Sequence, residues 1–505
     1  MSRNIYIYVA LIWLLIIFLL GEWGLRGTDQ YWYISDLESL VDGYGKSNTV
    51  FSGSLLRGYD GNSFIHQTLI LYLLTPLAKI FGSYNSWVIF NFTSMFFSSI
   101  LIYKSMIKLN AGVIRAWIAF GIFLSNPITI FIIGEPLVET TQPMFISLIL
   151  YFLVSIQSPL EYQNERSIIK ILAVVFFILL LDLIWPIYFP MVIIIILYFI
   201  YISFKSGFYI YLFSAIVFIF LYATTKIVLL SGGDIPNIED LIMNGTVNGN
   251  NTEFWLNKSK TDFSFDPAMS KILSNIVAQF YQSDYKLFAI YSMFNILLFK
   301  SIFSIREIFF YRKLLVIASI AFLISIAVVI VIHQNQYRYL YPVLPVVVIL
   351  AMVPLSQSCK DKVFSIENIV GLLMIAIGVL SSTFIFQSKF NSIEKDMAYS
   401  AAYNNISKYI PLGEDVVGCW PSVTQHLPYI LKRRDVIMFP SWGSSEYFKE
   451  VVNKNKIKWL LCNENFSTKK SDNFIFIKHD GIRVNGSRSK IDMHLFSIVN
   501  KLNKD

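Results

Sequence analysis

Charge is scarce in this chain. Of its 505 residues only 15% are Asp, Glu, Lys or Arg, whereas a soluble domain has about a quarter. Hydrophobic residues make up 55% of the chain, and its mean hydropathy is +0.58. They fall in uninterrupted runs of about 20 residues, the length of a helix that crosses a bilayer. The composition therefore excludes a soluble enzyme or a nucleic-acid factor and predicts a multi-span membrane protein.

Cysteine and histidine are also rare, with three and five residues. Three cysteines exclude a disulfide framework and a cysteine-rich metal site, and the histidines show no HxxxH or paired spacing, so we expect no metal site. The chain has no P-loop and no GxGxxG motif, which excludes an ATP-driven transporter and a nucleotide-sugar Rossmann domain. No cofactor is expected to be required, although a divalent cation remains open.

Basic residues outnumber acidic ones by 41 to 33, and in a membrane protein they collect on the cytoplasmic side. The segment 64–81 is apolar enough to span, but Pro76 and Lys79 interrupt its end. If it spanned, the basic residues near 104–115 would lie outside the cell. We therefore place it in the external interface, which makes every cytoplasmic loop basic.

This topology predicts a mainly α, polytopic bundle of about 11 transmembrane helices in the bacterial inner membrane, with a cytoplasmic N-terminus. The first helix is the uncleaved apolar run Ile5–Leu20. The other spans are expected at residues 85–103, 113–133, 141–157, 168–185, 186–204, 208–230, 285–303, 312–332, 337–356 and 367–387.

Two domains are expected. Residues 1–387 form the transmembrane domain, with external loops at 22–84 and 231–284, and residues 388–505 form a small periplasmic α/β domain. The runs DVVGCW, KIKWLLCNE, NFIFIKHDG and HLFSIVN are short and rich in β-formers, whereas SSEYFKEVVNKNK has helical spacing. Cys419 and Cys462 both lie on these predicted strands, and the sequence allows either a disulfide or two separate buried thiols.

The first polar cluster follows the first helix. Asp29, Tyr33 and Asp36 have i, i+4, i+7 spacing, so on a helix they share one face. Such a face could carry a general base that deprotonates a sugar or lipid hydroxyl. The alternative is an N-cap at Thr28 or Asp29 followed by a solvated acidic face.

The second cluster is GEPLVETTQP, in an external loop. Glu135 and Glu139 are four residues apart, and Pro136 and Pro143 predict a short, bent segment. Two acids at one membrane boundary repel each other unless a cation or a proton lies between them. The segment therefore holds either a second catalytic acid or only solvated loop charges.

The third cluster is HQNQYRYLYPVLP, which begins a span from outside. Arg338 suits bidentate phosphate binding, so it is a candidate clamp for a phospholipid headgroup. The alternative is interfacial anchoring, because Tyr337, Tyr339 and Tyr341 resemble an aromatic belt. Lys226 is a similar candidate that could instead snorkel to the interface. Further polar residues at external span ends are Arg26, Arg57, His66, His333 and, as a weaker hint, Asp182.

With these residues in place, the chain resembles the GT-C superfamily of integral-membrane glycosyltransferases. Thr28-Asp29-Gln30-Tyr31 resembles the Asp-Glu/Asp-x-Tyr motif of that superfamily, with Gln30 in place of the second acid. The interfacial segment near Asp60–His66, the acid in the next external loop, Arg338-Tyr339-x-x-Pro342 and the C-terminal α/β domain also match. The second acid, often Asp before Pro in the superfamily, is here Glu135-Pro136 or Glu139. The His-Pro-Pro or Lys-Pro segment is not reproduced.

The resemblance implies an inverting enzyme that moves a sugar from a polyprenyl-phosphate carrier to an acceptor on the periplasmic face. The size and domain plan are most similar to bacterial O-antigen glucosyltransferases, so glucose and a surface polysaccharide are the expected donor sugar and acceptor. Lipid A aminoarabinose transferases and protein O-mannosyltransferases share the plan but keep motifs that this chain lacks. Asp29 would be the base, Glu135 or Glu139 the second acid, and Arg338 the phosphate clamp.

In this scheme Asp29 and Arg338 converge on one cavity that opens to the periplasm. The expected substrate-binding residues are Asp36, Tyr33, Arg57, His66, Lys226, His333, Arg338 and Tyr339. Two other functions remain open: a lipid-linked oligosaccharide flippase or transporter, and a polysaccharide-modifying membrane acyltransferase. A transporter predicts ionisable residues near the bilayer midplane, which residues 85–133 and 312–356 largely lack, whereas an acyltransferase needs a catalytic His.

Overall fold

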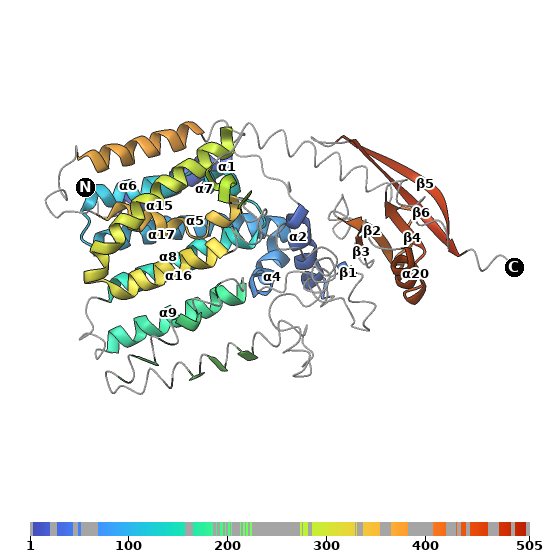
Figure 1. The fold of residues 1–505 in the computed structure, drawn as a ribbon, viewed down its shortest axis with the longest axis horizontal. Coiled ribbons are helices and arrows are strands. Elements are labelled where there is room, and N and C mark those ends of the chain that lie inside the picture. The colour runs from blue at the N-terminus through green and yellow to red at the C-terminus, as the bar shows by residue number, and fades with distance from the viewer. Residues whose placement is uncertain are drawn as a thin grey trace. The chain divides into compact units, whose positions relative to one another are not determined.

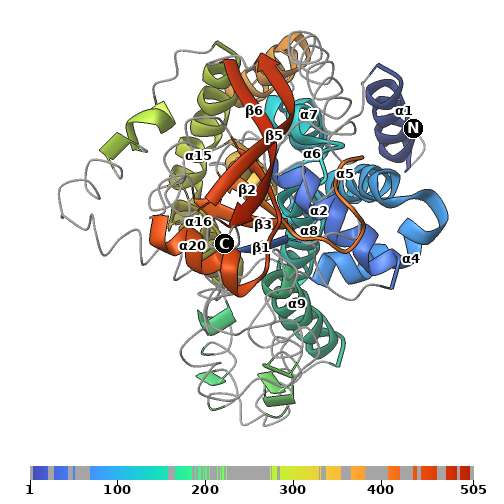
Figure 2. The same ribbon diagram turned by 90° about the vertical axis from the view of Figure 1, so that its right-hand side faces the viewer.

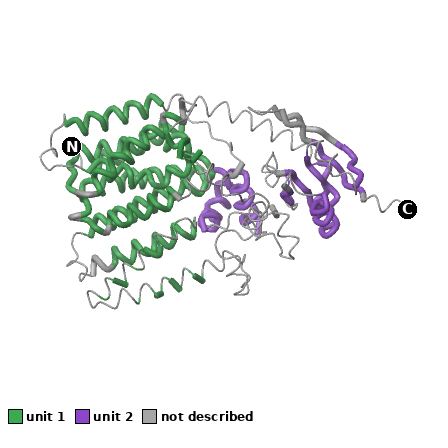
Figure 3. The backbone as a smooth tube through the Cα atoms, viewed as in Figure 1, with its two compact units in different colours: residues 1–23, 87–226, 263–390 green, residues 24–86, 227–262, 391–505 purple. Residues whose placement is uncertain are grey.

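The structure is a computed structural model of the whole chain. It describes residues 4–20, 28–43, 49–51, 69–156, 165–184, 273–274, 276–280, 285–328, 330, 337–353, 365–381, 408–420, 431, 436–440, 445–462, 474–485 and 490–500, together with single positions between 188 and 224. The chain divides into two compact units (Figure 3). Unit 1 comprises residues 1–23, 87–226 and 263–390, and unit 2 comprises residues 24–86, 227–262 and 391–505.

Unit 1 is a bundle of apolar helices that run roughly parallel to one another (Figure 1). Its described elements are α1 (Ile5–Leu20), α5 (Ser83–Lys108, from Trp87 onward), α6 (Val113–Ser125), α7 (Pro127–Ile132), α8 (Val138–Ser155), α9 (Glu165–Ile184), α15 (Tyr285–Tyr311), α16 (Lys313–Val328), the 3-10 helix η4 (Tyr337–Leu340), α17 (Leu344–Met352) and the helix Ile366–Ser381. The predicted helical bundle is confirmed. The expected spans 186–204 and 208–230 lie mostly outside the described residues.

Three helical stretches of the described chain are long and apolar enough to cross a membrane: Ser83–Lys108, Val113–Ile132 and Val138–Ser155. The shorter apolar helices Ile5–Leu19, Leu69–Phe81, Ile290–Ile305, Leu315–Ala327 and Ile366–Ser381 have 10–17 residues. The helix α1 belongs to the bundle, because Trp13 Nε1 donates to the carbonyl of Leu124 at 3.1 Å.

Proline divides two of the spans that the sequence predicts as continuous. The predicted span 113–133 is two helices, α6 and α7, separated at Asn126-Pro127. Pro127 lacks an N–H and suits the first turn of a helix, and Asn126 Oδ1 caps α7 by accepting from the Ile128 N–H at 3.0 Å. The predicted span 337–356 is likewise divided into η4, a turn and α17, near Pro342 and Pro345.

The helix α17 forms the centre of the bundle, since all nine of its residues are buried. It packs against α15, α6 and α8. A helix that is apolar all round is expected in such a fully enclosed position.

Unit 2 contains a six-stranded sheet with the order β1-β3-β2-β4-β6-β5, in which β1 comes from the N-terminal part of the chain and the other five strands from the C-terminal part. The strands are β1 (Thr49–Phe51), β2 (Val416–Trp420), β3 (Val436–Pro440), β4 (Trp459–Cys462), β5 (Phe474–Asn485) and β6 (Lys490–Asn500), with the helix α20 (Ser445–Lys454). The four predicted strands and the predicted helix are confirmed. Two strands, β3 and β1, are not predicted from the sequence, and β1 comes from a distant part of the chain and pairs in parallel with β3.

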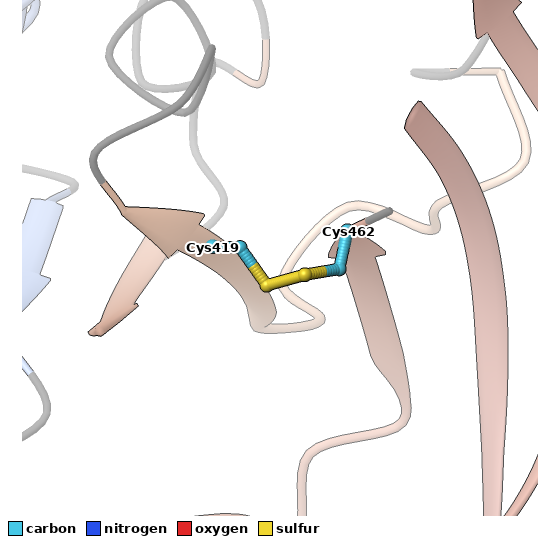
Figure 4. Close-up of a disulfide and its surroundings, with 2 residues drawn as sticks. All are labelled: Cys419 and Cys462. Carbon is cyan, nitrogen blue, oxygen red and sulfur yellow. A yellow bond between two sulfur atoms is a disulfide. The ribbon is translucent and has the colours of Figure 1, made fainter. Parts of the chain in front are cut away.

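Cys419 on β2 and Cys462 on β4 form a disulfide (Figure 4). This outcome decides between the two alternatives that the sequence left open. The bond lies in an apolar core in which Phe439, Phe448 and Val451 are fully buried. Figure 2 shows α20 beside the sheet, with β5 and β6 as a long antiparallel pair. Because β2 and β4 are neighbouring parallel strands in the middle of the sheet, the disulfide links two central strands.

Unit 2 also contains two helices from the N-terminal part of the chain, α2 (Thr28–Val41) and α4 (Leu69–Phe81), which pack against each other. The predicted helix that carries Asp29, Tyr33 and Asp36 is therefore present. Residues 30–37 of α2 are all buried. A solvated acidic face, the alternative interpretation of this segment, is wrong for Asp36, which is 1% exposed.

Candidate functional site

The candidate site in unit 1 is built on the turn that joins α7 to α8. Gly134 has a φ of 82°, a left-handed conformation that favours glycine, and it is followed by Glu135 and Pro136. The helix α8 then begins at Val138, so Glu139 lies in its first turn. A carboxylate there is stabilised by the positive end of the helix dipole.

Glu135 and Glu139 are both buried, at 4% and 3% exposure, so the interpretation as solvated loop charges is wrong. They do not share a helix face, since only Glu139 is helical. Pro143, one turn further along α8, cannot donate a hydrogen bond to the carbonyl of Glu139.

A polar clamp from α5 holds this turn. Asn91 Nδ2 donates to the carbonyl of Glu135 at 2.7 Å, and Asn91 Oδ1 accepts from the hydroxyl of Thr140 at 2.7 Å. The Thr140 hydroxyl also lies 2.5 Å from the carbonyl of Leu137. Asn91 is 2% exposed, and a buried amide is stable only when it is hydrogen-bonded. These bonds fix the backbone on both sides of Glu139.

Glu139 forms an ion pair with Arg338. The Nε of Arg338 lies 3.4 Å from Oε1 of Glu139, and their side chains are 18% and 4% exposed. Both residues are candidates from the sequence, but their pairing is not predicted from it. The pair supplies the cation that the second cluster was expected to need, because the charge of Glu139 is balanced by Arg338.

Arg338 lies on η4 and is also held by its neighbour. Its Nη2 donates to the hydroxyl of Tyr339 at 3.0 Å, and its guanidinium lies 5.0 Å from the centre of that ring. Tyr339 and Tyr341 are 4% and 1% exposed. The interpretation of these tyrosines as a membrane-facing aromatic belt is therefore wrong for both residues, because their side chains are covered by protein.

A second polar group lies along α8. The hydroxyl of Tyr188 donates to Oε1 of Gln142 at 2.6 Å, and Tyr188 interacts electrostatically with Glu139 and Asp182. Tyr188, Gln142 and Asp182 are all at most 1% exposed. The weak sequence hint at Asp182 thus marks a side chain in the same buried polar region as Glu139.

Three residues of this site, Asn91, Gln142 and Tyr188, are not among those predicted from the sequence. Each is a polar side chain inside an apolar segment, and polar groups at membrane depth are expected to face one another or a cavity. This signal was present for Asn91 and Gln142, whereas tyrosine is too common in this chain, with 29 residues, to mark a single position.

The first cluster lies in unit 2, on α2. Tyr33 and Asp36 are buried, and burial together with the charge of Asp36 raises the pKa of Tyr72 on α4. Asp29 is in the first turn of α2, but its side chain is outside the described part of the structure. The convergence of Asp29 with Arg338 therefore stays a prediction.

Four other predicted binding residues also lie outside the described residues: Arg57, His66, Lys226 and His333. In the part of the chain that is described, no three His, Cys, Asp or Glu side chains come close enough together to hold a metal ion.

The arrangement provides a partly exposed arginine side chain, Arg338, fixed by a buried carboxylate and a buried tyrosine. Arg338 carries five N–H donors in a planar fork that matches the oxygens of a phosphate. Because Glu139 and Tyr339 restrict its side chain, less conformational entropy is lost when an anion binds. The site can therefore hold a phosphate group in a defined orientation.

The helical bundle with a small α/β unit at the C-terminus is the fold class that the sequence predicts. The chain is similar over its whole length to the crystal structure of ArnT from Cupriavidus metallidurans bound to undecaprenyl phosphate, with a TM-score of 0.54 and 11% identity, covering 100% of both chains. The apo structure of the same protein gives a TM-score of 0.52 and 11% identity over 98% of this chain and 97% of the other. No protein-family model and no curated protein sequence matches the chain.

Proposed function

We propose that the protein is a GT-C-type glycosyltransferase that takes a sugar from a polyprenyl-phosphate donor at the external face of the bacterial inner membrane. The observation that carries the proposal is the Glu139–Arg338 ion pair, in which a partly exposed arginine side chain is oriented by a buried carboxylate. The similar fold of ArnT, whose crystal structure contains undecaprenyl phosphate, supports a lipid-borne donor.

In the proposed reaction, Arg338 binds the phosphate of the donor, and its charge stabilises the phosphate as it leaves. Asp29 accepts the proton of the acceptor hydroxyl. The acceptor oxygen forms a bond to the anomeric carbon while the bond from that carbon to the phosphate oxygen breaks, and the phosphate leaves with the electron pair. A single displacement inverts the anomeric carbon.

Glu139 is proposed to set the orientation of Arg338, and Glu135 to contribute a second carboxylate beside the acceptor. Asp36, Tyr33, Arg57, His66, Lys226, His333 and Tyr339 are the further proposed substrate-binding residues. A phosphate leaving group needs little acid help, so one base and one cationic clamp are chemically sufficient. The proposal requires no resident cofactor.

The finer proposal is that the sugar is glucose and the acceptor a surface polysaccharide such as O-antigen. To test it, the purified protein is incubated with polyprenyl-phosphate-linked glucose and O-antigen, and the polysaccharide is analysed by mass spectrometry. A gain of one hexose per repeat is expected. Transfer of glucose to a different acceptor would overturn the acceptor, and no transfer from any polyprenyl-phosphate sugar would overturn the enzyme class.

Two variants test the roles of the residues in the same assay. Asp29→Asn should abolish transfer at normal expression, and retained activity would remove Asp29 from the role of base. Arg338→Ala should weaken donor binding far more than acceptor binding, and equal effects on both would contradict the clamp. The matched control is Lys458→Gln, which removes an exposed cation in unit 2 and should leave both affinities unchanged.

A further inference from the structure

Three basic side chains from different parts of the bundle meet at the C-terminal end of α8. Lys108 comes from the last turn of α5, Lys170 from α9, and Arg312 from the junction of α15 and α16. This end of α8 is opposite to the end that carries Glu139, and the positive-inside rule assigns it to the cytoplasm.

The three cations contact two consecutive residues: Ser155, the last residue of α8, and Ile156, its C-cap. The Nζ of Lys108 donates to the hydroxyl of Ser155, and the Nζ of Lys170 donates to the carbonyl of Ser155 at 3.1 Å. Nη1 of Arg312 donates to the carbonyl of Ile156 at 2.9 Å. Lys108 also lies 4.0 Å from the ring centre of Tyr151, one turn earlier on α8.

These contacts satisfy the hydrogen-bonding needs of the helix end but do not balance its charge. The carbonyls at a helix C-terminus carry the equivalent of about −0.5 charge, which is less than the two positive charges of Lys108 and Lys170. In the described part of the chain, neither Lys108 nor Lys170 forms an ion pair with a carboxylate.

Arg115 at the start of α6 shows the contrast. It is 1% exposed, and Glu367 on the helix Ile366–Ser381 pairs with it at 2.5 Å. The protein thus supplies its own carboxylate where a cation is fully buried. Lys108, Lys170 and Arg312 are only half buried, so an anion from outside the chain can reach them.

The geometry is also prepared for such an anion. Neutral acceptors and a tyrosine ring already restrict the two lysine side chains, so binding an anion needs little further ordering. The exposed residues Lys104, one turn before Lys108, and Lys313, next to Arg312, add positive charge at the same end of the bundle.

We propose that this basic cluster, made of Lys108, Lys170 and Arg312, binds the phosphate of an anionic phospholipid headgroup in the cytoplasmic leaflet. That leaflet is rich in anionic lipids, and basic pockets between transmembrane helices on the cytoplasmic side suit their headgroups. The site is separate from the proposed donor site and does not depend on the proposed transferase activity.

The experiment compares lipid binding to the full-length protein and to the double variant Lys108→Gln/Lys170→Gln. Purified protein is titrated with phosphatidylglycerol, phosphatidylcholine or inorganic phosphate, and bound molecules are counted by native mass spectrometry. Wild type should bind phosphatidylglycerol in preference to phosphatidylcholine. The double variant should bind phosphatidylglycerol about thirtyfold more weakly, since each lysine near a membrane surface contributes about a fivefold factor.

The matched control is Lys458→Gln, which removes an exposed lysine in unit 2 and should leave the affinity unchanged. Lys108→Arg/Lys170→Arg keeps both charges and should bind phosphatidylglycerol like wild type, even if the glutamine variant is poorly folded. Equal binding of both phospholipids, or an unchanged affinity in a folded glutamine variant, would overturn the proposal. Competition by inorganic phosphate at the same concentration as the lipid would show that the ligand is free phosphate and would overturn the lipid source.

Discussion

At the residue scale, the ion pair between Glu139 and Arg338 connects two elements of the candidate site, α8 and η4. Glu139 begins α8, whereas Arg338 lies on η4 just before α17. A carboxylate that is 4% exposed is costly unless a cation accompanies it. The pair therefore links the stability of the bundle to the orientation of the proposed phosphate clamp.

Glu139→Gln should lower the free energy of unfolding by about 3 kcal/mol, because loss of one partner leaves the charge of the other without its counter-ion. It should also slow transfer, since Arg338 loses its orienting partner. Thermal unfolding in detergent and the transfer assay measure the two effects.

The double variant Glu139→Gln/Arg338→Gln should be less destabilised than the sum of the two single variants, as expected for residues in contact. The control is Glu446→Gln, on the exposed side of α20. Strict additivity of the two single changes would show that the pair carries no coupling.

Glu414 provides a pH-dependent contribution in unit 2. Hydrogen bonds from Lys458 Nζ at 2.8 Å and from Trp459 Nε1 at 2.5 Å lower its pKa below the ordinary 4.5. Because the folded pKa is lowered, the stabilisation is complete above pH 4.5 and is lost as the pH falls through the folded value.

The melting temperature of the wild type should therefore fall more steeply between pH 5 and pH 3 than that of Glu414→Gln. Fluorescence of Trp459, which loses a hydrogen-bond acceptor, should change over the same range. Parallel curves for the two proteins would contradict the assignment.

The sequence predicted several residues of the site but not how they combine. Glu135, Glu139 and Arg338 were recognised because charged groups at a membrane boundary are unusual. Their pairing was not predictable, because it depends on how α8 and η4 are brought together. Asn91 is marked in the sequence as a polar group at membrane depth, but a single amide in an apolar run gives no local pattern that would identify its hydrogen-bond partners.

At the element scale, glycine allows α6 and the helix Ile366–Ser381 to approach closely. A Cβ atom on Gly378 would lie 2.3 Å from the carbonyl oxygen of Ser125, and one on Gly121 would lie 2.6 Å from Cδ1 of Ile375. The first contact is with backbone and the second with the end of a flexible side chain.

Gly378→Ala should consequently destabilise the protein by about 2 kcal/mol, because the two helices must separate. Gly121→Ala is the matched control and should be nearly neutral, since Ile375 can change its rotamer and alanine favours the helix. Melting temperatures of the two variants in the same detergent measure the difference. Equal losses would show that the backbone contact does not limit the packing.

Most elements were predictable from the sequence, and the exceptions have physical causes. Long apolar runs predicted the helices of unit 1, and short runs of β-formers predicted β2, β4, β5 and β6. The interruptions at Asn126-Pro127 and near Pro342 were missed because hydropathy does not register a break of one or two residues. The three residues of β1 are too few to form a recognisable strand pattern.

At the scale of the whole molecule, the sheet of unit 2 is assembled from two distant parts of the chain. β1 comes from residues 49–51 and forms an edge by pairing with β3, in the register Thr49 to Val436 and Phe51 to Met438. The remaining strands all lie after residue 415. A fragment that starts at residue 388 would lack this edge.

Such a fragment, residues 388–505, should self-associate, because an unpaired strand edge is a template for pairing with another chain. A peptide of residues 47–53 should restore a monomer, whereas the same peptide with Val50→Pro should not, since proline disfavours the strand. Size-exclusion chromatography with light scattering over a range of concentrations measures the outcome. A monomeric fragment without peptide would show that β1 is dispensable.

The pairing of β1 with β3 also constrains how the protein is made. Residues 49–51 leave the ribosome long before residues 436–440, and the polypeptide between them must first be inserted into the bilayer. The edge strand β1 can therefore pair with β3 only after translation is nearly complete. In a nascent chain stalled before β3, β1 would have no strand to pair with, because β3 has not yet been synthesised.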